Sequence, residues 1–334
     1  MPAFDCGEQE ASRATQRETF KIGHYSVPRL FVGLWQLSSP AWGSAPRSRI
    51  MAEFQKYVDA GFTAFDMADH YGDAELLFGR FRSSYPGPKS IFCATKYCVF
   101  APIPQTEEVV HEAVSQRLRN IKSETVDLLQ YHWQHIMQAD PRVTNLGLCN
   151  FDTKRMKEVL EAGINIVTNQ VQCGGFLAEK WLGKPAPEAF SEAMTPSLRK
   201  VTSLPPSLPP YLPSLPSRPP TKTPIIQYLE MITIWGGWPL FQTLLSTLST
   251  IAAKHSASIS TVAVRWVLDF PYVGAVLVGA RMGVSQHMEE NLAVYGWSLD
   301  EEDREKIEDV LAMSRRDDVF ADMGDCGSEY RVGK

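Results

Sequence analysis

The chain has 334 residues, of which 44% are apolar and 21% are charged, and its formal charge at neutral pH is −5. The apolar fraction excludes a disordered, collagen-like or coiled-coil protein, and the mild acidity excludes a general nucleic-acid binder. The six cysteines form no CxxC pair. Their spacing indicates reduced thiols and predicts neither a metal site nor a disulfide framework.

The beginning of the chain predicts no targeting or membrane segment. Residues 1–19 are polar and mixed in charge, so we expect a disordered lead without a secretory signal. The most apolar stretch, residues 225–241, is interrupted by polar residues, glycines and a proline, which excludes a membrane span. The sequence therefore predicts a cytoplasmic protein that has no membrane partner and no nucleic-acid partner.

Short apolar runs alternate with amphipathic segments from residue 30 onward. In chain order, strands are predicted at 30–34, 63–67, 90–95, 126–130, 143–148, 164–168 and 273–278, and helices at 47–60, 74–81, 107–121, 153–162, 241–255, 260–268, 286–294 and 300–313. This alternation is typical of βα units and a parallel sheet. We predict one domain at 20–313, between the lead and a tail at 314–334.

Two connections are too short for this pattern. A parallel crossover needs a dozen or more residues, usually with a helix. The residues between Tyr131 and Val143 include Pro141 and leave no room for a normal helix. After Gln172 the chain passes directly into Cys173-Gly174-Gly175, so a helix and a strand are missing there.

Residues 201–227 form a proline-rich insertion, and residues 201–224 hold nine of the 23 prolines. Such a segment forms neither a helix nor a central strand. Its PxxP spacing fits a ligand of SH3-like or WW-like modules, and its composition equally fits a flexible surface insertion. A third interpretation is a translated intron, because valine codons begin with GT, a glutamine codon can end in AG, and the residues between favour pyrimidine-rich codons.

Four chemically active residues follow successive predicted strands. Asp66 ends one strand and Tyr71 lies on the loop after it, Lys96 ends the next strand, and His132 ends the strand after that. The carboxyl ends of parallel barrel strands form the rim where catalysis takes place. Each residue alone has an ordinary explanation, as a cap, a surface charge or a structural histidine. Their joint position favours a catalytic site.

These motifs resemble those of the aldo/keto reductase superfamily. FDMADHYGDAE at 65–75 resembles the family's Asp-plus-Tyr motif, and Thr95-Lys96 and Tyr131-His132-Trp133 match its Lys and His. Cys149-Asn150, the NQ pair at 169–170 and VGARMGVSQHMEEN at 278–291 resemble its cofactor-binding segments. The resemblance implies an α/β protein with a (β/α)8 TIM-type barrel, here incomplete. Helix 4, helix 6 and strand 7 are missing or vestigial, which leaves seven of eight strands.

The resemblance implies an NADP(H)-dependent oxidoreductase that reduces small aldehydes or ketones to alcohols. Tyr71 would be the general acid, with its pKa lowered by Lys96, because a nearby ammonium favours tyrosinate. Asp66 would hold Lys96, and His132 would bind the carbonyl oxygen. The alternatives are a catalytically impaired cofactor-binding or scaffold paralogue, and the product of a faulty gene model.

The resemblance also implies a set of cofactor contacts. Asn150 and Gln170 would hold the nicotinamide carboxamide, and Gly33 and Trp35 would line the nicotinamide end. The remaining contacts would come from the C-terminal motif: Gly279 within it, Arg281 and His287 at the 2′-phosphate, and Glu290 and Asn291 at the adenine. A cationic side chain at the 2′-phosphate favours NADP over NAD. No GxGxxG motif follows the first strand, which disfavours a Rossmann domain.

Overall fold

The computed structural model describes residues 17–38, 40–87, 90–100, 104, 106–132, 140–171, 177–187 and 227–318. The chain divides into two compact units. Among the described residues, the first unit holds the chain up to 171 together with 261–299, and the second holds 177–260 together with 300–318. The proline-rich residues 201–226, with their proposed SH3 or WW docking role, lie outside the described part, as does most of the predicted lead and tail.

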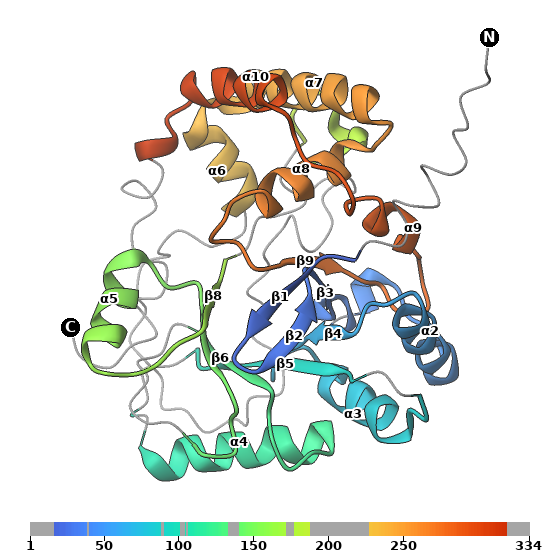
Figure 1. Ribbon diagram of the computed structural model, residues 1–334, viewed down its shortest axis with the longest axis vertical. Helices are drawn as coiled ribbons and strands as arrows, with labels where there is room; N and C mark the ends of the chain where they lie inside the picture. The colour runs from blue at the N-terminus through green and yellow to red at the C-terminus, as the bar shows by residue number, and fades with distance from the viewer. Residues whose placement is uncertain are drawn as a thin grey trace, which may run out of the picture. The chain divides into compact units, whose positions relative to one another are not determined.

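The first unit has an α/β fold, in which a parallel sheet is accompanied by helices, as predicted (Figure 1). Its elements in chain order are β3 (Leu30–Gly33), α2 (Arg47–Asp59), β4 (Ala64–Asp66), α3 (Ala74–Ser84), β5 (Phe92–Cys98), α4 (Glu107–Ile121), β6 (Leu128–His132), β7 (Leu146–Cys149), α5 (Thr153–Glu161), β8 (Thr168–Gln170), β9 (Val276–Gly279) and α9 (Met288–Leu292), with 3-10 turns at Trp35–Ser38 and Pro40–Trp42. The strand order is β8-β7-β6-β5-β4-β3-β9, and neighbouring strands are parallel.

The prediction of an incomplete barrel is confirmed by this seven-stranded sheet. After β8, the next strand among the described residues is β9, so strand 7 of a full barrel is missing from that part of the chain. The described residues of the connection from β6 to β7, 140–145, contain a turn and a bridge from Val143 to Val126, with no helix. Without the eighth strand, the described part of the sheet keeps two edges.

The two outer strands are the exposed ones. The strands between them are buried apart from partly buried end residues, whereas β8 is only partly buried throughout. In β9, Leu277 is 36% exposed, and Val171 just after β8 is 64% exposed. Apolar side chains at unpaired edges favour association with other strands.

An N-terminal hairpin that the sequence analysis missed packs on the inner face of the sheet. Its antiparallel strands are β1 (Thr19–Ile22) and β2 (Tyr25–Pro28). Ile22 and Val27 share a buried cluster with Phe31, Phe92 and Leu128 of the parallel strands. The hairpin strands mix polar and apolar residues, so neither contains the continuous apolar run by which the equally short parallel strands were predicted. β1 begins inside the predicted lead, so Thr19 belongs to the folded part.

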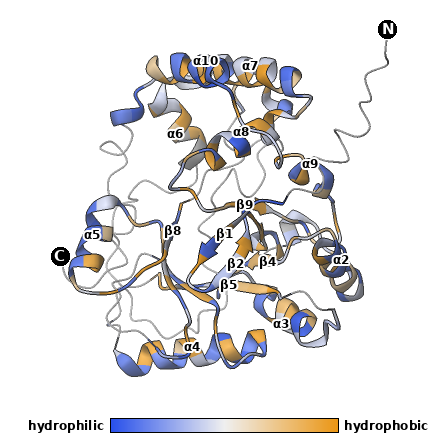
Figure 2. Ribbon diagram, viewed as in Figure 1, coloured by the Kyte–Doolittle hydropathy of each residue, from blue (hydrophilic) through white to orange (hydrophobic). Residues whose placement is uncertain are grey.

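Side-chain alternation sorts the strand residues onto two faces. Phe31, Phe92 and Leu128 pack toward the hairpin, while Leu30, Val32 and Phe65 join the larger core cluster with α2 and α3. Figure 2 shows apolar residues along β4 and β5, and apolar and polar residues alternating along α4. This amphipathic pattern is what the helix periodicity predicted.

The second unit is helical. It contains a 3-10 turn at Glu179–Trp181, α6 (Gln227–Trp235), α7 (Gly237–His255), the first residues of α8 (Ile259–Leu268) and α10 (Glu301–Ala312). An aspartate pair caps α10, since Asp300 and Asp303 each accept from the other's backbone N–H. Besides shifts of one residue in α8 and α10, two boundaries of this unit differ from the prediction. Gln227, assigned to the insertion, begins α6, and α7 begins before residue 241, because Pro239 is tolerated in a first helical turn.

Among the described residues, no helix is both long enough and apolar enough to cross a membrane.

Two buried tyrosines of the first unit predict a loss of stability at alkaline pH. Burial raises the pKa of Tyr57 to about 12, with the Glu53 carboxylate adding to the shift, and burial raises the pKa of Tyr295 to about 12. In the unfolded chain both titrate near pH ~10. Each phenol therefore contributes about 2–3 kcal/mol to the free energy of unfolding. This contribution is complete below pH ~10 and is lost as the pH rises toward 12.

Urea unfolding at about pH 9 and about pH 11 tests this expectation. Tyr57→Phe has no phenol to ionise, so its loss of unfolding free energy between the two pH values should be smaller than that of the parent chain. Tyr272→Phe is the matched control, because Tyr272 is 80% exposed. Equal pH dependence in the parent and the Tyr57→Phe chain would contradict the prediction.

Candidate active site

The structure brings the four predicted catalytic residues together at one end of the parallel sheet. Asp66 and His132 are the last residues of β4 and β6, and Lys96 lies two residues before the end of β5. Tyr71 lies on the loop between β4 and α3. The cluster is buried, since the most exposed of the four, His132, is only 6% exposed.

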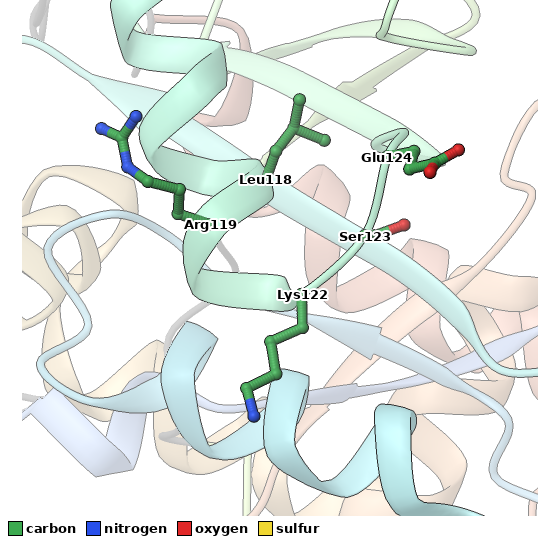
Figure 3. A pocket seen from close by; sticks show the side chains of 5 residues that line it. All are labelled: Leu118, Arg119, Lys122, Ser123 and Glu124. Atoms are coloured by element: carbon green, nitrogen blue, oxygen red, sulfur yellow. The ribbon is translucent and has the colours of Figure 1, made fainter.

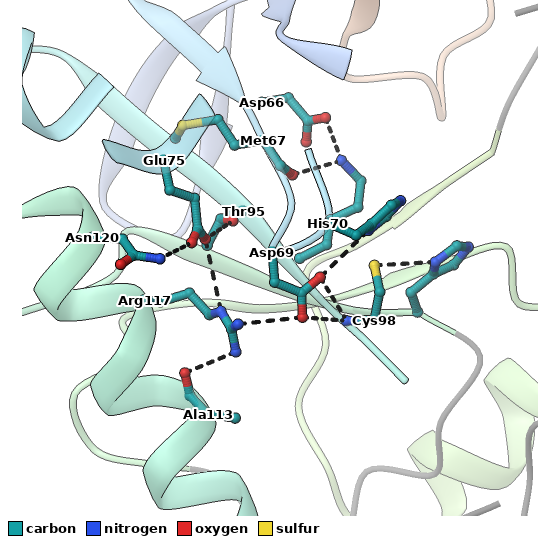
Figure 4. Close-up of polar contacts among 12 residues, drawn as sticks. Asp66, Met67, Asp69, His70, Glu75, Thr95, Cys98, Ala113, Arg117 and Asn120 are labelled. Carbon is teal, nitrogen blue, oxygen red and sulfur yellow. Dashed lines mark hydrogen bonds and ion pairs between the residues drawn. The ribbon is translucent and has the colours of Figure 1, made fainter. Parts of the chain in front are cut away.

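An ion pair between Lys96 and Asp66 is the centre of this cluster. The Lys96 ammonium contacts Asp66 Oδ2 and donates to the carbonyl oxygen of Met67 at 2.9 Å (Figure 4). Gln130 Nε2 donates to the other oxygen, Asp66 Oδ1, at 3.0 Å. Sequence reasoning missed Gln130. Its signal was its position two residues before His132, which places both side chains on the same face of a strand.

The phenol of Tyr71 lies against the ammonium, with Lys96 Nζ 5.0 Å from the ring centroid. Burial raises the pKa of Tyr71, and the opposing effect of Lys96 does not offset burial together with the Asp66 carboxylate. The net shift is therefore upward, and our expectation of a lowered pKa is corrected. Burial lowers the pKa of Lys96, but Asp66 and Tyr71 raise it above its ordinary value, so Lys96 stays charged.

Both ring nitrogens of His132 have partners. Nδ1 lies 3.3 Å from Cys98 Sγ, and Nε2 lies 2.8 Å from Nδ2 of Asn150. Asn150 follows β7 in the left-handed backbone region, with φ of 60°, a conformation that asparagine adopts more readily than most residues. The sequence analysis placed Asn150 against the cofactor, and its contact with His132 was not foreseen.

A second buried polar network supports the loop that carries Tyr71 (Figure 4). Arg117 of α4 lies 3.3 Å from Asp69 and 3.7 Å from Glu75. Glu75 also accepts from Thr95 Oγ1 at 2.6 Å and from Asn120 at 2.8 Å. Burial raises the pKa of Glu75, although Arg117 opposes that shift. The network joins the loop, β5 and α4, and it could not be predicted because its members are up to 51 positions apart (from Asp69 to Asn120) in the sequence.

Five of the predicted cofactor residues lie at the same strand ends. Gly33 and Gly279 are register partners at the ends of β3 and β9. The backbone N–H of Asn150 donates to the carbonyl oxygen of Gln170 at 2.8 Å, so their two amides belong to neighbouring strand ends. Trp35 follows Gly33 by two residues and packs on Trp42, with ring centroids 5.7 Å apart.

The remaining predicted cofactor residues follow β9. Arg281 is exposed and borders a cavity of about 360 Å³ that is also lined by Gln36, Trp42 and Gly72. His287 precedes α9 and lies 3.3 Å from Glu290, one turn along. The backbone N–H of Asn291 donates to the carbonyl oxygen of His287 at 2.9 Å. The pairing of His287 with Glu290 was not anticipated.

A second depression, of about 440 Å³, lies at the C-terminal end of α4 and the residues after it (Figure 3). Its lining residues are Leu118, Arg119, Lys122, Ser123 and Glu124. None of the predicted site residues lines it. Since α4 runs back from the C-terminal end of β5, this depression lies away from the end of the sheet that carries the cluster.

Comparisons with known proteins point to one family. The family model described as "Aldo/keto reductase family" matches residues 29–186 and 174–312. The chain is 24% identical over 321 residues to the aldo-keto reductase YhdN of Bacillus subtilis, covering 87% of this chain and 92% of that relative. It is 24% identical over 298 residues to NADPH-dependent codeinone reductase 1-1 of Papaver somniferum, covering 77% and 79% respectively.

Solved structures share the fold. The glycerol dehydrogenase AKR11B4 from Gluconobacter oxydans superposes with a TM-score of 0.59 and 21% identity, covering 88% of this chain and 95% of that one. A Gox0644 mutant in complex with NADPH gives a TM-score of 0.54 and 17% identity, covering 96% and 97%. At these identities the likeness concerns the fold.

Proposed function

The chain belongs to the aldo/keto reductase family, a family of oxidoreductase enzymes, and from this premise we propose that it reduces small aldehydes or ketones to alcohols with NADPH. The observation that carries the proposal is the buried contact of Lys96 with both Asp66 and Tyr71 at the carboxyl ends of the strands. In this proposal Tyr71 is the proton donor, Lys96 is a fixed cation and Asp66 is its counter-charge, and all three are buried.

Tyr71 donates the proton that the carbonyl oxygen gains during reduction. Because its pKa is raised by burial, the phenol is protonated at neutral pH and is available as an acid. The proton transfer leaves a tyrosinate, which the Lys96 ammonium stabilises at close range. Asp66, with Gln130 on its second oxygen, keeps Lys96 charged and fixed in place.

His132 orients the carbonyl group. In the structure Nε2 accepts from the Asn150 amide, because Nδ2 can only donate. When the Asn150 amide turns to the nicotinamide carboxamide, the ring takes the tautomer with its proton on Nε2, and Nε2–H then donates to the carbonyl oxygen. The contact of Nδ1 with Cys98 limits the rotation of the ring. In this proposal Asn150 has two roles, with His132 before the cofactor binds and with the nicotinamide afterwards.

The residues present fit a nicotinamide dinucleotide phosphate. Asn150 and Gln170 offer two amides whose donors and acceptors complement a carboxamide. Gly33 and Gly279 leave the adjoining strand ends without side chains, next to Trp35. Arg281 presents an exposed cation to the cavity of about 360 Å³, near His287, Glu290 and Asn291 in sequence. When bound, NADPH supplies the hydride.

Arg281→Ala should weaken NADPH binding selectively. A hydrogen bond to a charged group contributes about 1.5–3 kcal/mol, so the Kd for NADPH should rise roughly 10–100-fold. The Kd for NADH, which lacks the 2′-phosphate, should change little. Quenching of intrinsic fluorescence measures both constants, and Arg119→Ala, on an exposed arginine of α4, is the control. An equal rise in Kd for NADPH and NADH would show that Arg281 does not bind the 2′-phosphate.

Steady-state oxidation of NADPH by the purified full chain, with a panel of small aldehydes and ketones, tests the function. The proposal expects NADPH consumption that depends on the carbonyl compound and yields the alcohol in equal amount. A cofactor-binding scaffold without turnover is the second candidate. The incompletely buried outer strands β8 and β9 favour it, because they mark a barrel that lacks its eighth strand in the described part of the chain. NADPH binding without oxidation in this assay would support that candidate instead.

A further inference from the structure

We propose that Asp69, His70 and Cys98 bind a zinc ion at the strand ends, and that the bound ion inhibits carbonyl reduction. The binding stands on the geometry of these three side chains alone. The inhibition rests on the function proposed above.

Three ligands of different chemistry meet at this place. Asp69 and His70 lie on the loop after β4, and Cys98 is the last residue of β5. A carboxylate oxygen, an imidazole nitrogen and Cys98 Sγ all lie within 4.8 Å of one another (Figure 4). Asp69 Oδ1 is 3.4 Å from His70 Nδ1, and the Cys98 backbone N–H donates to Asp69 Oδ2 at 3.0 Å.

The ligand types favour zinc over magnesium or calcium. Thiolate and imidazole are ligands of zinc, with bonds of about 2.0–2.3 Å, whereas magnesium and calcium prefer oxygen. Three protein ligands leave a fourth position for water, as in zinc sites that are not closed. The His70 side chain is 37% exposed, so an ion can enter from solvent.

Zinc binding releases one proton, that of the Cys98 thiol. In the free site Cys98 is a thiol, whose sulfur lies 3.3 Å from His132 Nδ1. Zinc replaces the thiol proton, which is released to solvent, and the sulfur–metal bond forms in its place. Arg117, 3.3 Å from Asp69 Oδ2, orients the carboxylate and leaves Oδ1 toward His70.

A second cluster of candidate metal ligands differs from the cluster at Cys98 in its charge and ligand types. His255, Asp300 and Asp303 also lie within 4.8 Å of one another. There, however, the Lys254 ammonium contacts Asp300 at 2.6 Å and Asp303 at 2.9 Å. An ammonium already neutralises that group, and no thiol is present in it. The cluster at Cys98 holds the softer ligands, and the described ion pair of its carboxylate with a lysine or arginine is that with Arg117 at 3.3 Å.

Occupancy of the site would disturb the proposed chemistry directly. Cys98 Sγ is the partner of His132 Nδ1 at 3.3 Å, and a zinc thiolate alters that contact and brings a positive charge beside the imidazole. His70 packs edge-on against Tyr71, with ring centroids 4.8 Å apart. Both the group that orients the carbonyl and the acid therefore border the ion.

Cobalt titration of the reduced, chelator-treated full chain tests the binding. Co²⁺ occupies zinc sites and gives a thiolate-to-cobalt absorption in the near ultraviolet, which should appear with one equivalent and disappear when zinc is added. Cys98→Ser should abolish this band. His70→Asn should keep the band but weaken cobalt binding by more than the roughly 10–100-fold that loss of an outer-shell partner of a ligand costs, because His70 is itself a ligand. Thermal unfolding of each variant checks that it is folded.

Two variants serve as controls. Cys149→Ser removes another thiol of the same sheet, and His255→Asn removes the imidazole of the group held by Lys254. Both should keep the band and the affinity. Absence of a thiolate band in the parent chain, or its persistence in Cys98→Ser, would overturn the site.

Zinc inhibition of NADPH oxidation tests the second half. The parent chain should lose turnover with zinc and regain it with chelator, while Cys98→Ser should show no zinc effect relative to its own metal-free rate. If cobalt binds but zinc does not inhibit turnover, the proposed inhibition is wrong and the proposed metal site still stands. A metal-free chain without turnover would contradict the proposed function, and with it the inhibition, while the cobalt titration still decides the site.

Discussion

Tyr71→Phe is expected to lower kcat for carbonyl reduction by about 10²–10⁴-fold, the usual contribution of a positioned general acid. The substitution removes one oxygen atom from a ring that is only 5% exposed and keeps the contacts of that ring in the core. Because the hydroxyl is the only group that changes, binding of NADPH should remain within a few-fold of the parent value. Stopped-flow and steady-state oxidation of NADPH measure the two effects separately.

The pH dependence sharpens this test. Burial raises the pKa of Tyr71, so the phenol remains a proton donor as the pH rises through 10, and the parent chain should keep its turnover there for as long as it stays folded. Tyr272→Phe, which removes the same hydroxyl from an exposed ring, is the control and should keep parent turnover. Unchanged turnover in Tyr71→Phe would show that Tyr71 is not the general acid.

Lys96→Met should lower the free energy of unfolding by about 3–5 kcal/mol. Asp66 and Lys96 are each 2% exposed, and removal of one member of a buried ion pair leaves the other charge without compensation. After the substitution, Gln130 is the remaining side-chain donor described for the Asp66 carboxylate. Urea unfolding followed by circular dichroism measures the loss.

The double variant Asp66→Asn with Lys96→Met separates charge from packing. It removes the stranded charge, so it should recover at least half of the stability that Lys96→Met loses. Lys306→Met is the control, because the ion pair of Lys306 with Glu302 is exposed and its loss should cost no more than about 1 kcal/mol. A double variant as unstable as Lys96→Met would show that packing, and not the charge of Asp66, explains the effect.

The strand ends show how far sequence reasoning reached. Asp66, Lys96 and His132 were predicted at the ends of successive strands. Asp66 and His132 are the last residues of β4 and β6, whereas β5 continues two residues beyond Lys96. A two-residue repeat and parallel pairing fix the face on which the three side chains lie. The predicted gap after Gln172 agrees with a seven-stranded sheet, since a strand that is missing from the sequence cannot pair. The hairpin at 19–28 was missed because its strands mix polar and apolar residues and contain no continuous apolar run.

The sequence by itself determined the strand–helix alternation, the two short connections and the joint position of four chemically active residues, and its resemblance to a known family implied the incomplete barrel and carbonyl reduction. Only the tertiary structure decided which side chains touch: Gln130 on Asp66, Asn150 on His132, and Asp69 and His70 beside Cys98. It also decided the net direction of the Tyr71 pKa, because the effect of burial depends on everything that surrounds the phenol. Local patterns record periodicity along one segment, whereas contacts and desolvation arise between segments that are distant in the chain.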